Sequence, residues 1–177
     1  DETVNGTLYF ANGKITLGSN YLTIGSSGSI ANANASRYVV TNGHLVRNGV
    51  GTTAKDFPVG RATSYNPVTI ATGSGTDNFR VRVIGSVSPS SANDAAAVQR
   101  TWDIVEETPG GNGTMTVTVQ WNGSEEGGSF SPRAAAVSWR HNGTVWVEEG
   151  TVASIAGTDP YTATITGLTS FSRYAIG

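Results

Sequence analysis

Two histidines, His44 and His141, are the side chains of this 177-residue chain best suited to proton transfer near neutral pH. A general base or a metal site needs partner groups within hydrogen-bond reach, and the sequence indicates no partner for either histidine. Each stands beside an Asn-Gly step, where a polar side chain is expected in any case. No serine lies in a Gly-x-Ser-x-Gly motif that opens a helix, which argues against a serine hydrolase. We therefore expect a protein that is not an enzyme.

Paired carboxylates occur at Glu106-Glu107, Glu125-Glu126 and Glu148-Glu149, and carboxylate pairs are the acid and the nucleophile of glycosidases. Neighbouring residues of a strand point to opposite faces of its sheet, so the two members of one pair cannot act on the same bond. A pairing across the chain, such as Glu106 with Glu126, is left open by the sequence. Solvated strand ends are the interpretation that we favour for these residues.

Calcium is the metal that the sequence leaves open, because several hard oxygen ligands lie in or near expected loops. These residues are Asp77, Asn78, Asn93, Asp94 and Asp103. Their positions do not follow the spacing of a calcium-binding loop, so we expect no cofactor and at most a structural calcium ion. Cysteine is absent, which excludes disulfides, thiolate nucleophiles and zinc–thiolate sites.

Lys14 and Lys55 raise the question of a covalent cross-link, since surface fibre domains can join a buried lysine to an asparagine or an aspartate. Lys55 alternates with Phe57 along a strand-like segment and could therefore face inward. We favour the simpler interpretation, in which the lysine stem covers apolar surface while the ammonium group stays in water.

Trp139 and Trp146 are candidates for a binding surface. If Asn142-Gly143 forms a two-residue turn, Trp139 lies opposite Trp146 and the two indoles share one face of a hairpin. Such a pair can stabilise a sheet from within the core, or it can form an exposed platform that stacks on sugar rings or on another subunit. Tyr65 and Tyr161 are further candidates for a surface of this kind.

Seven Asn-Gly steps indicate the elements that must carry these side chains. Asn-Gly supplies the two consecutive positive φ angles of a type I′ turn, whose twist matches that of the two strands of a hairpin. The first residues of these steps are Asn5, Asn12, Asn42, Asn48, Asn112, Asn122 and Asn142. The sequence therefore predicts an all-β fold with many antiparallel hairpins.

A short internal repeat marks residues 1–50 as a lobe of their own. Apolar pairs recur every seven residues, at Leu8-x-Phe10, Ile15-x-Leu17 and Leu22-x-Ile24. This spacing fits either a meander of small strands or a β-solenoid, in which each unit buries its apolar face against the next. Hairpins at Asn12-Gly13 and Asn42-Gly43 would add three opposite pairs, namely Phe10 with Ile15, Leu8 with Leu17, and Val40 with Leu45.

Residues 51–177 are expected to form an antiparallel β-sandwich, because longer strand-like segments follow one another at regular intervals. The predicted strands are 68–71, 78–87, 101–106, 114–121, 135–140, 144–148, 161–166 and 171–176. Trp102 and Trp121 alternate with polar residues within two of these strands, so both are expected in the core. One helix is predicted over Ser91–Gln99, and the boundary between the two parts near Gly49–Thr53.

Charge is sparse and almost balanced, with 11 Lys and Arg against 13 Asp and Glu. This composition has no electrostatic footprint for nucleic acid or for an anionic membrane. No apolar run approaches the roughly 20 residues of a membrane-spanning helix, so we expect no membrane insertion. Because the chain begins at Asp1 without a signal-like segment, we interpret it as a processed or excised mature chain.

Motifs along nearly the whole chain resemble a known group of proteins. They are Tyr38-Val-Val-Thr-Asn-Gly43, Phe57-Pro-Val-Gly60, Ser64-Tyr-Asn-Pro-Val-Thr-Ile70, Thr76-Asp-Asn-Phe-Arg-Val-Arg-Val83, Arg100-Thr-Trp-Asp-Ile104, Val119-Gln-Trp-Asn122 and Ser170-Phe-Ser-Arg-Tyr-Ala-Ile-Gly177. The chain resembles β-rich modules in large secreted and surface proteins of Bacteroidetes. In such proteins a strand like the last of these motifs commonly precedes a C-terminal sorting domain of the type IX secretion route. The resemblance implies an extracellular or cell-surface location and supplies no catalytic residue.

Two functional hypotheses follow. In the first, the chain is a structural or adhesive module, a surface or filament subunit that associates with copies of itself through a repeat end or an exposed sheet edge. In the second, it is a carbohydrate-binding module that presents Trp139 and Trp146, with Tyr65 or Tyr161, to a cell-surface polysaccharide. We favour the first.

Overall fold

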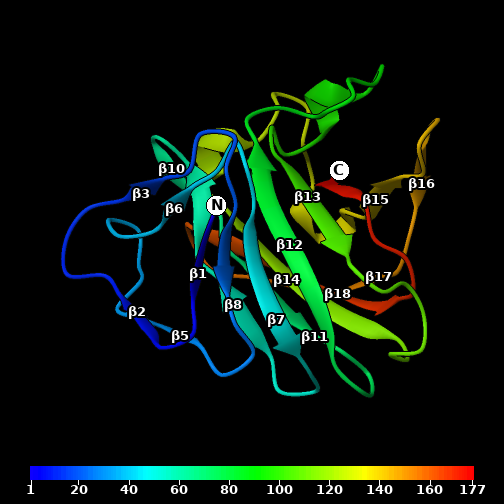
Figure 1. Cartoon of the computed structure of the whole chain (residues 1–177). Coiled ribbons are helices and arrows are strands. Elements are labelled where there is room, and N and C mark those ends of the chain that lie inside the picture. The colour runs from blue at the N-terminus through cyan, green and yellow to red at the C-terminus, as the bar shows by residue number, and fades with distance from the viewer.

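The computed structural model describes all residues, Asp1–Gly177. Its regular secondary structure is almost entirely β-strand (Figure 1), so the predicted all-β class is confirmed. The strands of the N-terminal part are β1 (Glu2–Val4), β2 (Thr7–Tyr9), β3 (Ile15–Thr16), β4 (Leu22–Ile24), β5 (Ser29–Ala31), β6 (Val39–Val40) and β7 (Leu45–Val50). The remaining strands are β8 (Lys55–Phe57), β9 (Val59–Arg61), β10 (Ser64–Tyr65), β11 (Val68–Ala71), β12 (Asp77–Ile84), β13 (Thr101–Glu106), β14 (Met115–Trp121), β15 (Ser138–His141), β16 (Trp146–Glu148), β17 (Thr151–Ala156), β18 (Tyr161–Leu168) and β19 (Arg173–Ile176).

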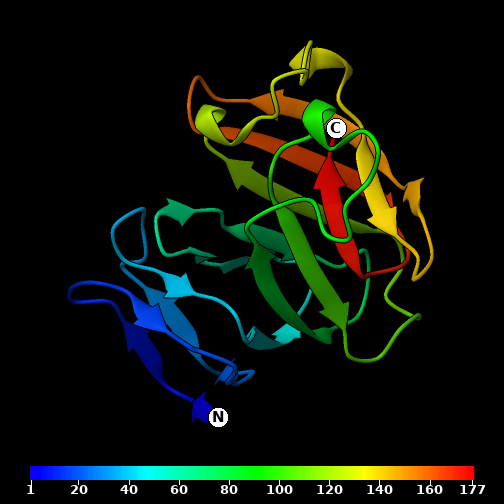
Figure 2. The same ribbon diagram turned by 90° about the horizontal axis from the view of Figure 1, so that it is seen from above.

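The N-terminal strands form a three-sided parallel β-solenoid, which we call the coil (Figures 1 and 2). Its sides are β1-β4-β7, β2-β5 and β3-β6-β9, and every pairing within them is parallel. Glu2 pairs with Leu22, 20 residues later, and Ile15 pairs with Val39, 24 residues later. One turn of the coil therefore takes 20 or more residues, and the seven-residue repeat of the sequence corresponds to one side of a turn. Of the two alternatives, the solenoid is the one formed.

The two N-terminal hairpins predicted from the sequence are wrong. β2 and β3 belong to different sides of the coil, so Phe10 does not lie opposite Ile15, nor Leu8 opposite Leu17. Likewise β6 and β7 belong to different sheets, so Val40 does not lie opposite Leu45. The physical reason is that each apolar side of a solenoid is buried against the next turn rather than against its neighbour in the sequence.

The Asn-Gly steps do not form type I′ turns. Such a turn needs a positive φ at both central residues, yet the only residues other than glycine with positive φ are Asn32 and Asp159. Only Asn142-Gly143 joins two strands that pair with each other, β15 and β16. The other steps lie at corners of the coil, inside β7, or in loops outside paired strands. In this chain, therefore, one of the seven Asn-Gly steps forms a hairpin, and the others lie at coil corners, in loops or, in one case, within a strand.

Two sheets form the sandwich, one behind the other in Figure 1. The first has the order β1-β4-β7-β12-β13-β19-β15-β16, and the second β17-β18-β14-β11-β8. Side chains in β12 and β14 alternate between buried and half-buried along the strand, as expected for strands with one face in a core. Trp102 and Trp121 are fully buried between the sheets, which confirms their predicted position.

All eight strands predicted after residue 50 are present, and the structure adds β8, β9, β10 and β17. The predicted helix over Ser91–Gln99 is wrong, because only the single turn η1 (Asp94–Ala96) is helical. The rest of this segment forms a turn and bends, and Val98 forms a β-bridge with Glu126 and donates its N–H to the Ile176 carbonyl at 2.8 Å. The other helices, η2 (Gly123–Glu125) and η3 (Arg133–Ala135), are also three residues long, far short of a membrane span.

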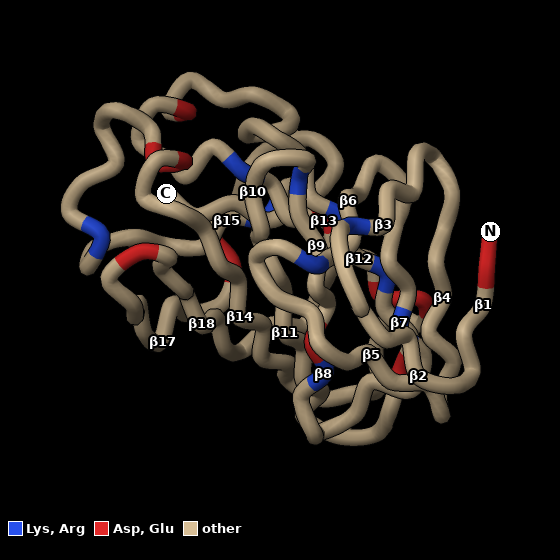
Figure 3. The backbone as a smooth tube through the Cα atoms, turned by 90° about the vertical axis from the view of Figure 1, so that its left-hand side faces the viewer, with Lys and Arg blue, Asp and Glu red and all other residues tan.

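The coil and the sandwich share a strand and a core. The boundary expected near Gly49–Thr53 falls after β7, but β7 pairs with β4 of the coil on one edge and with β12 of the sandwich on the other. A single cluster of 27 buried apolar residues runs through both parts. Figure 3 shows the positions of Lys and Arg interspersed with those of Asp and Glu along the backbone.

Candidate functional site

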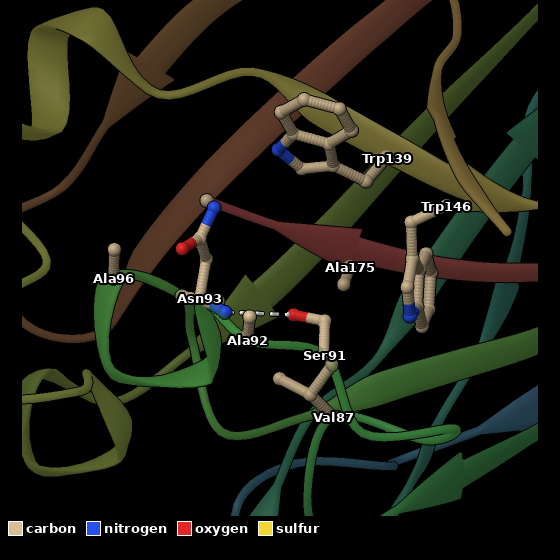
Figure 4. Close-up of a pocket in the computed structure, with 10 residues that line it drawn as sticks. Val87, Ser91, Ala92, Asn93, Ala96, Trp139, Trp146 and Ala175 are labelled. Atoms are coloured by element: carbon tan, nitrogen blue, oxygen red, sulfur yellow. Dashed lines mark hydrogen bonds between the residues drawn. The ribbon is translucent and has the colours of Figure 1, made fainter.

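A cavity of about 310 Å³ opens between β15, β16 and the end of β19 on one side and the loop that carries η1 on the other (Figure 4). Ten residues line it, of which seven are hydrophobic and none is charged. Trp139 and Trp146 form two of its walls, and Ala175 lies between them. The structure therefore brings together the two tryptophans that the sequence singled out.

The two tryptophans share a sheet face although their predicted register is wrong. Trp139 pairs with Glu148, and Trp146 pairs with His141. The Asn142 side-chain oxygen accepts hydrogen bonds from the backbone N–H groups that follow it, which moves the centre of the turn by one residue. The pairing consequently shifts by two residues, and a shift by two leaves every side chain on its original face.

Trp139 and Trp146 are both half-buried, and their indole N–H groups differ in environment. Trp146 Nε1 donates to the Pro89 carbonyl at 2.9 Å, and its ring meets that of His141 edge-on at 5.4 Å. Trp139 Nε1 lies beside Gly177, 3.4 Å from where a Cβ of that residue would stand, and makes no hydrogen bond within the chain. A hydrogen bond thus holds the Trp146 indole in place, whereas the Trp139 indole N–H is free to donate to a ligand.

The other two candidate aromatic residues lie elsewhere. The Tyr65 ring packs against the Tyr38 ring at a tilt of 41°, with the ring centres 5.1 Å apart, and burial, with the nearby charge of Asp56, raises the pKa of Tyr65 to about 12. Tyr161 packs against Trp121, and the Arg133 guanidinium lies 4.1 Å from the centre of its ring. Neither tyrosine lines the cavity, and we include neither in the candidate site.

Several carboxylates that we expected at solvated strand ends are buried in polar networks instead, which corrects that expectation. Glu125 is 6% exposed and pairs with Arg100 at 2.7 Å. Glu106 is 5% exposed and accepts a hydrogen bond from Asn112. Glu126 pairs with Arg133 in a separate cluster, so Glu106 and Glu126 do not act together.

The five residues considered as calcium ligands lie in three separate parts of the fold. Asp77 and Asn78 begin β12, Asn93 and Asp94 lie at η1, and Asp103 pairs with Arg82 on β12. No group of three or more histidine or acidic side chains is placed to hold a metal ion. Asp77 instead shares the Asn112 amide with Glu106, at 3.2 Å from each carboxylate.

Replacing Glu106 with Gln is expected to stabilise the protein at neutral pH. Burial raises the pKa of Glu106, the Asn112 hydrogen bond lowers it, and the charge of Asp77 raises it again, with a net upward shift. An acid with a raised pKa in the folded state loses stability as pH rises from its unfolded pKa of about 4.3 towards its folded pKa. The variant should therefore melt at a higher temperature than the wild type at pH 7, and the difference should shrink below about pH 4. A difference that is independent of pH would contradict this assignment.

One histidine and one acid do come close, outside the cavity. His44 Nε2 lies 3.8 Å from Asp103 Oδ2, and neither imidazole nitrogen has a hydrogen-bond partner. Burial raises the pKa of Asp103, but the neighbouring His44 and Arg82 outweigh it and lower the pKa below its usual value. A carboxylate with a lowered pKa is a weak base. His141 is half-buried, and its Nδ1 accepts the Gly143 N–H.

The two lysines that could form cross-links bond to backbone carbonyls. Lys14 Nζ donates to the Ala62 carbonyl and lies over the Tyr38 ring at 4.7 Å. Lys55 Nζ donates to the Asn48 carbonyl, and burial together with the charge of Arg47 lowers its pKa. Neither ammonium group has an Asn or Asp side chain as its hydrogen-bond partner.

The first turn of the coil forms a second candidate surface, which we call the open end. β1, β2 and β3 are the terminal strands of the three sides, and each has one unpaired edge. Phe10 and Leu17 of this turn are buried, but Val4 and Ile15 are only half-buried, whereas their partners one turn later, Ile24 and Val39, are fully buried. The open end therefore combines partly exposed apolar side chains with free backbone groups.

Comparison of the chain with protein-family models, with curated proteins and with solved structures found no match.

Proposed function

We propose that the chain is a non-enzymatic structural or adhesive module of the cell exterior that associates with a second copy of itself through the open end. The observation that carries this proposal is the set of three parallel edge strands that end the coil together. Unpaired strand edges readily pair with those of another chain, and a solenoid turn buries its apolar face only when another turn stacks on it. The extracellular location is proposed from the resemblance of these motifs to secreted surface modules.

The geometry of the coil limits the form of this association. At the other end of the coil, β7 pairs with β12 of the sandwich and β9 pairs with β10, so two of the three sides have no free edge there, and only β5 keeps one. The open end is the place where all three sides have a free edge, so we propose that it meets the open end of a second copy, in a two-fold arrangement that closes at a dimer. A filament requires an additional contact on the sandwich, and the free edge of β17 is a strand available for one.

Backbone geometry defines the residues that face a partner. The Glu2 N–H donates to the Tyr21 carbonyl, and the Val4 carbonyl accepts from the Gly25 N–H. Because alternate residues of an edge strand bond to the same neighbour, the backbone groups of Thr3 point to the free edge. By the same argument, Thr16 faces outward between Ile15 and Leu17, which bond to β6.

Proline at Thr3 and Thr16 should convert the dimer into a monomer. Proline removes the N–H donor of the free edge and obstructs pairing, while the hydrogen bonds within the coil stay intact. We expect size-exclusion chromatography with light scattering to give a dimer mass for the wild type and a monomer mass for the double variant, at unchanged circular dichroism.

Val145→Ser provides the control, since it removes an apolar side chain that is 53% exposed on the sandwich and should leave the dimer intact. A monomer mass for the wild type at all concentrations up to the millimolar range, or a dimer of the double proline variant, would refute the proposal.

A further inference from the structure

We infer that the cavity between Trp139 and Trp146 binds one or two units of a neutral sugar chain. This inference is independent of the open end, which lies on the coil, whereas the cavity lies on the sandwich. The two indoles flank the cavity and leave the space between them free (Figure 4). The two indoles are therefore placed to hold a ligand between them.

The lining matches the two kinds of surface that a pyranose ring presents. The C–H faces of the ring are apolar and suit an indole wall and an alanine floor, which Trp139, Trp146 and Ala175 supply. The hydroxyl groups at the ring edge need hydrogen-bond partners. Trp139 Nε1 is a free donor, and the Asn93 side chain makes no hydrogen bond within the chain. Figure 4 shows the Asn93 amide extending from the loop towards Trp139.

The same features disfavour other ligands. Cationic ligands such as choline are held by the faces of several aromatic rings, and no third aromatic ring and no acidic side chain lines this cavity. A purely apolar ligand would leave the amide of Asn93 and the indole N–H of Trp139 without partners at a desolvated site. The absence of charged lining residues argues equally against sulfated or uronic acid sugars.

The size of the cavity limits the length of sugar chain that it holds. Small-molecule pockets range over about 300–1,000 Å³, and a volume of about 310 Å³ lies at the lower limit of that range. A pocket of this size covers a short stretch of a polysaccharide, with the rest of the chain in solvent.

Tryptophan fluorescence tests this inference with little background from the rest of the molecule. Trp102 and Trp121 are 0% exposed, so a ligand-induced change in emission reports on Trp139 and Trp146. The probes are soluble laminarin, mannan, xylan and hydroxyethyl cellulose, with alginate as the charged comparison. We expect a saturable change with at least one neutral polymer and retardation of the protein in native gels that contain it.

Trp139→Ala and Asn93→Ala should each weaken binding, the first by about tenfold or more, as expected for the removal of a stacking residue at the centre of a site. Trp139→Phe keeps an aromatic wall but removes the N–H donor, so a partial loss is expected from it. Val145→Ser, on the same hairpin but outside the cavity, should bind like the wild type. Near-ultraviolet circular dichroism verifies that each variant is folded.

The inference is overturned if none of the neutral polymers gives a saturable signal, if alginate alone binds, or if a folded Trp139→Ala variant binds as tightly as the wild type. Because the proline variants of the open end leave the cavity unchanged, they should bind the same polymer with the same affinity. The experiments can therefore refute the sugar site without refuting the dimer, or refute the dimer without refuting the sugar site.

Discussion

Replacing Glu125 with alanine is expected to lower the free energy of unfolding by about 3–5 kcal/mol, because the change leaves a buried arginine without its counter-ion. Glu125 is 6% exposed, and the side chain of its partner Arg100 is 14% exposed. The two groups are 2.7 Å apart, and the second carboxylate oxygen accepts a hydrogen bond from Asn66 at 2.6 Å. All of these interactions are lost together.

The position of this network in the fold explains the size of the effect. Asn66 stands between β10 and β11 and also accepts the Trp102 indole N–H through its carbonyl. Glu125 ends η2 and caps it by accepting the Asn122 N–H at 2.9 Å. Arg100 directly precedes β13. A single carboxylate therefore ties together three segments that are distant in the sequence.

Urea denaturation followed by circular dichroism measures this loss, and Glu107→Ala is the matched control. Glu107 pairs with Arg80 at 3.2 Å, but both side chains are about one third exposed, at 39% and 32%. Exposed ion pairs contribute about 0–1 kcal/mol, so the control should change the unfolding free energy by that amount at most. Equal losses for the two variants would show that the Glu125 network does not stabilise the fold.

The sequence predicts strands and their buried positions better than it predicts which side chains interact across the fold. Alternation of apolar and polar residues placed Trp102 and Trp121 in the core correctly, because a strand with one buried face must alternate. The partner of Glu125 could not be predicted, since Arg100 lies 25 residues away and nothing local links them. For the same reason the predicted solvated strand ends at Glu106 and Glu125 were wrong.

The coil shows a second limit of sequence interpretation. A seven-residue repeat determines the length of a strand plus a corner, and this length is the same whether the strand pairs with its neighbour or with the next turn. Asn-Gly did not resolve the choice, because its glycine adopts a positive φ at a solenoid corner such as Gly13 as readily as in a hairpin. Trp139 and Trp146 lie on one sheet face, as the sequence predicted, although the predicted register was wrong, because the register error was two residues and a shift by an even number keeps each side chain on its face.

Replacing Ile24 with alanine tests whether the coil and the sandwich unfold as one unit. Ile24 lies on β4, inside the coil, and is 0% exposed within the shared core. Truncation of a buried isoleucine to alanine costs about 2–5 kcal/mol. All four tryptophans lie beyond residue 100, so their fluorescence reports only the sandwich.

If β7 and the common core couple the two parts, Ile24→Ala should move the tryptophan transition in urea by the full cost of the cavity, in step with the far-ultraviolet signal of the whole chain. Tyr9→Ser, at a side chain that is 64% exposed on the coil, should change the free energy of unfolding by no more than about 0.5 kcal/mol. A tryptophan transition that stays at its wild-type midpoint while circular dichroism records an earlier loss would mean that the coil unfolds separately. In that event the strand shared through β7 would hold the two parts together without making them one cooperative unit.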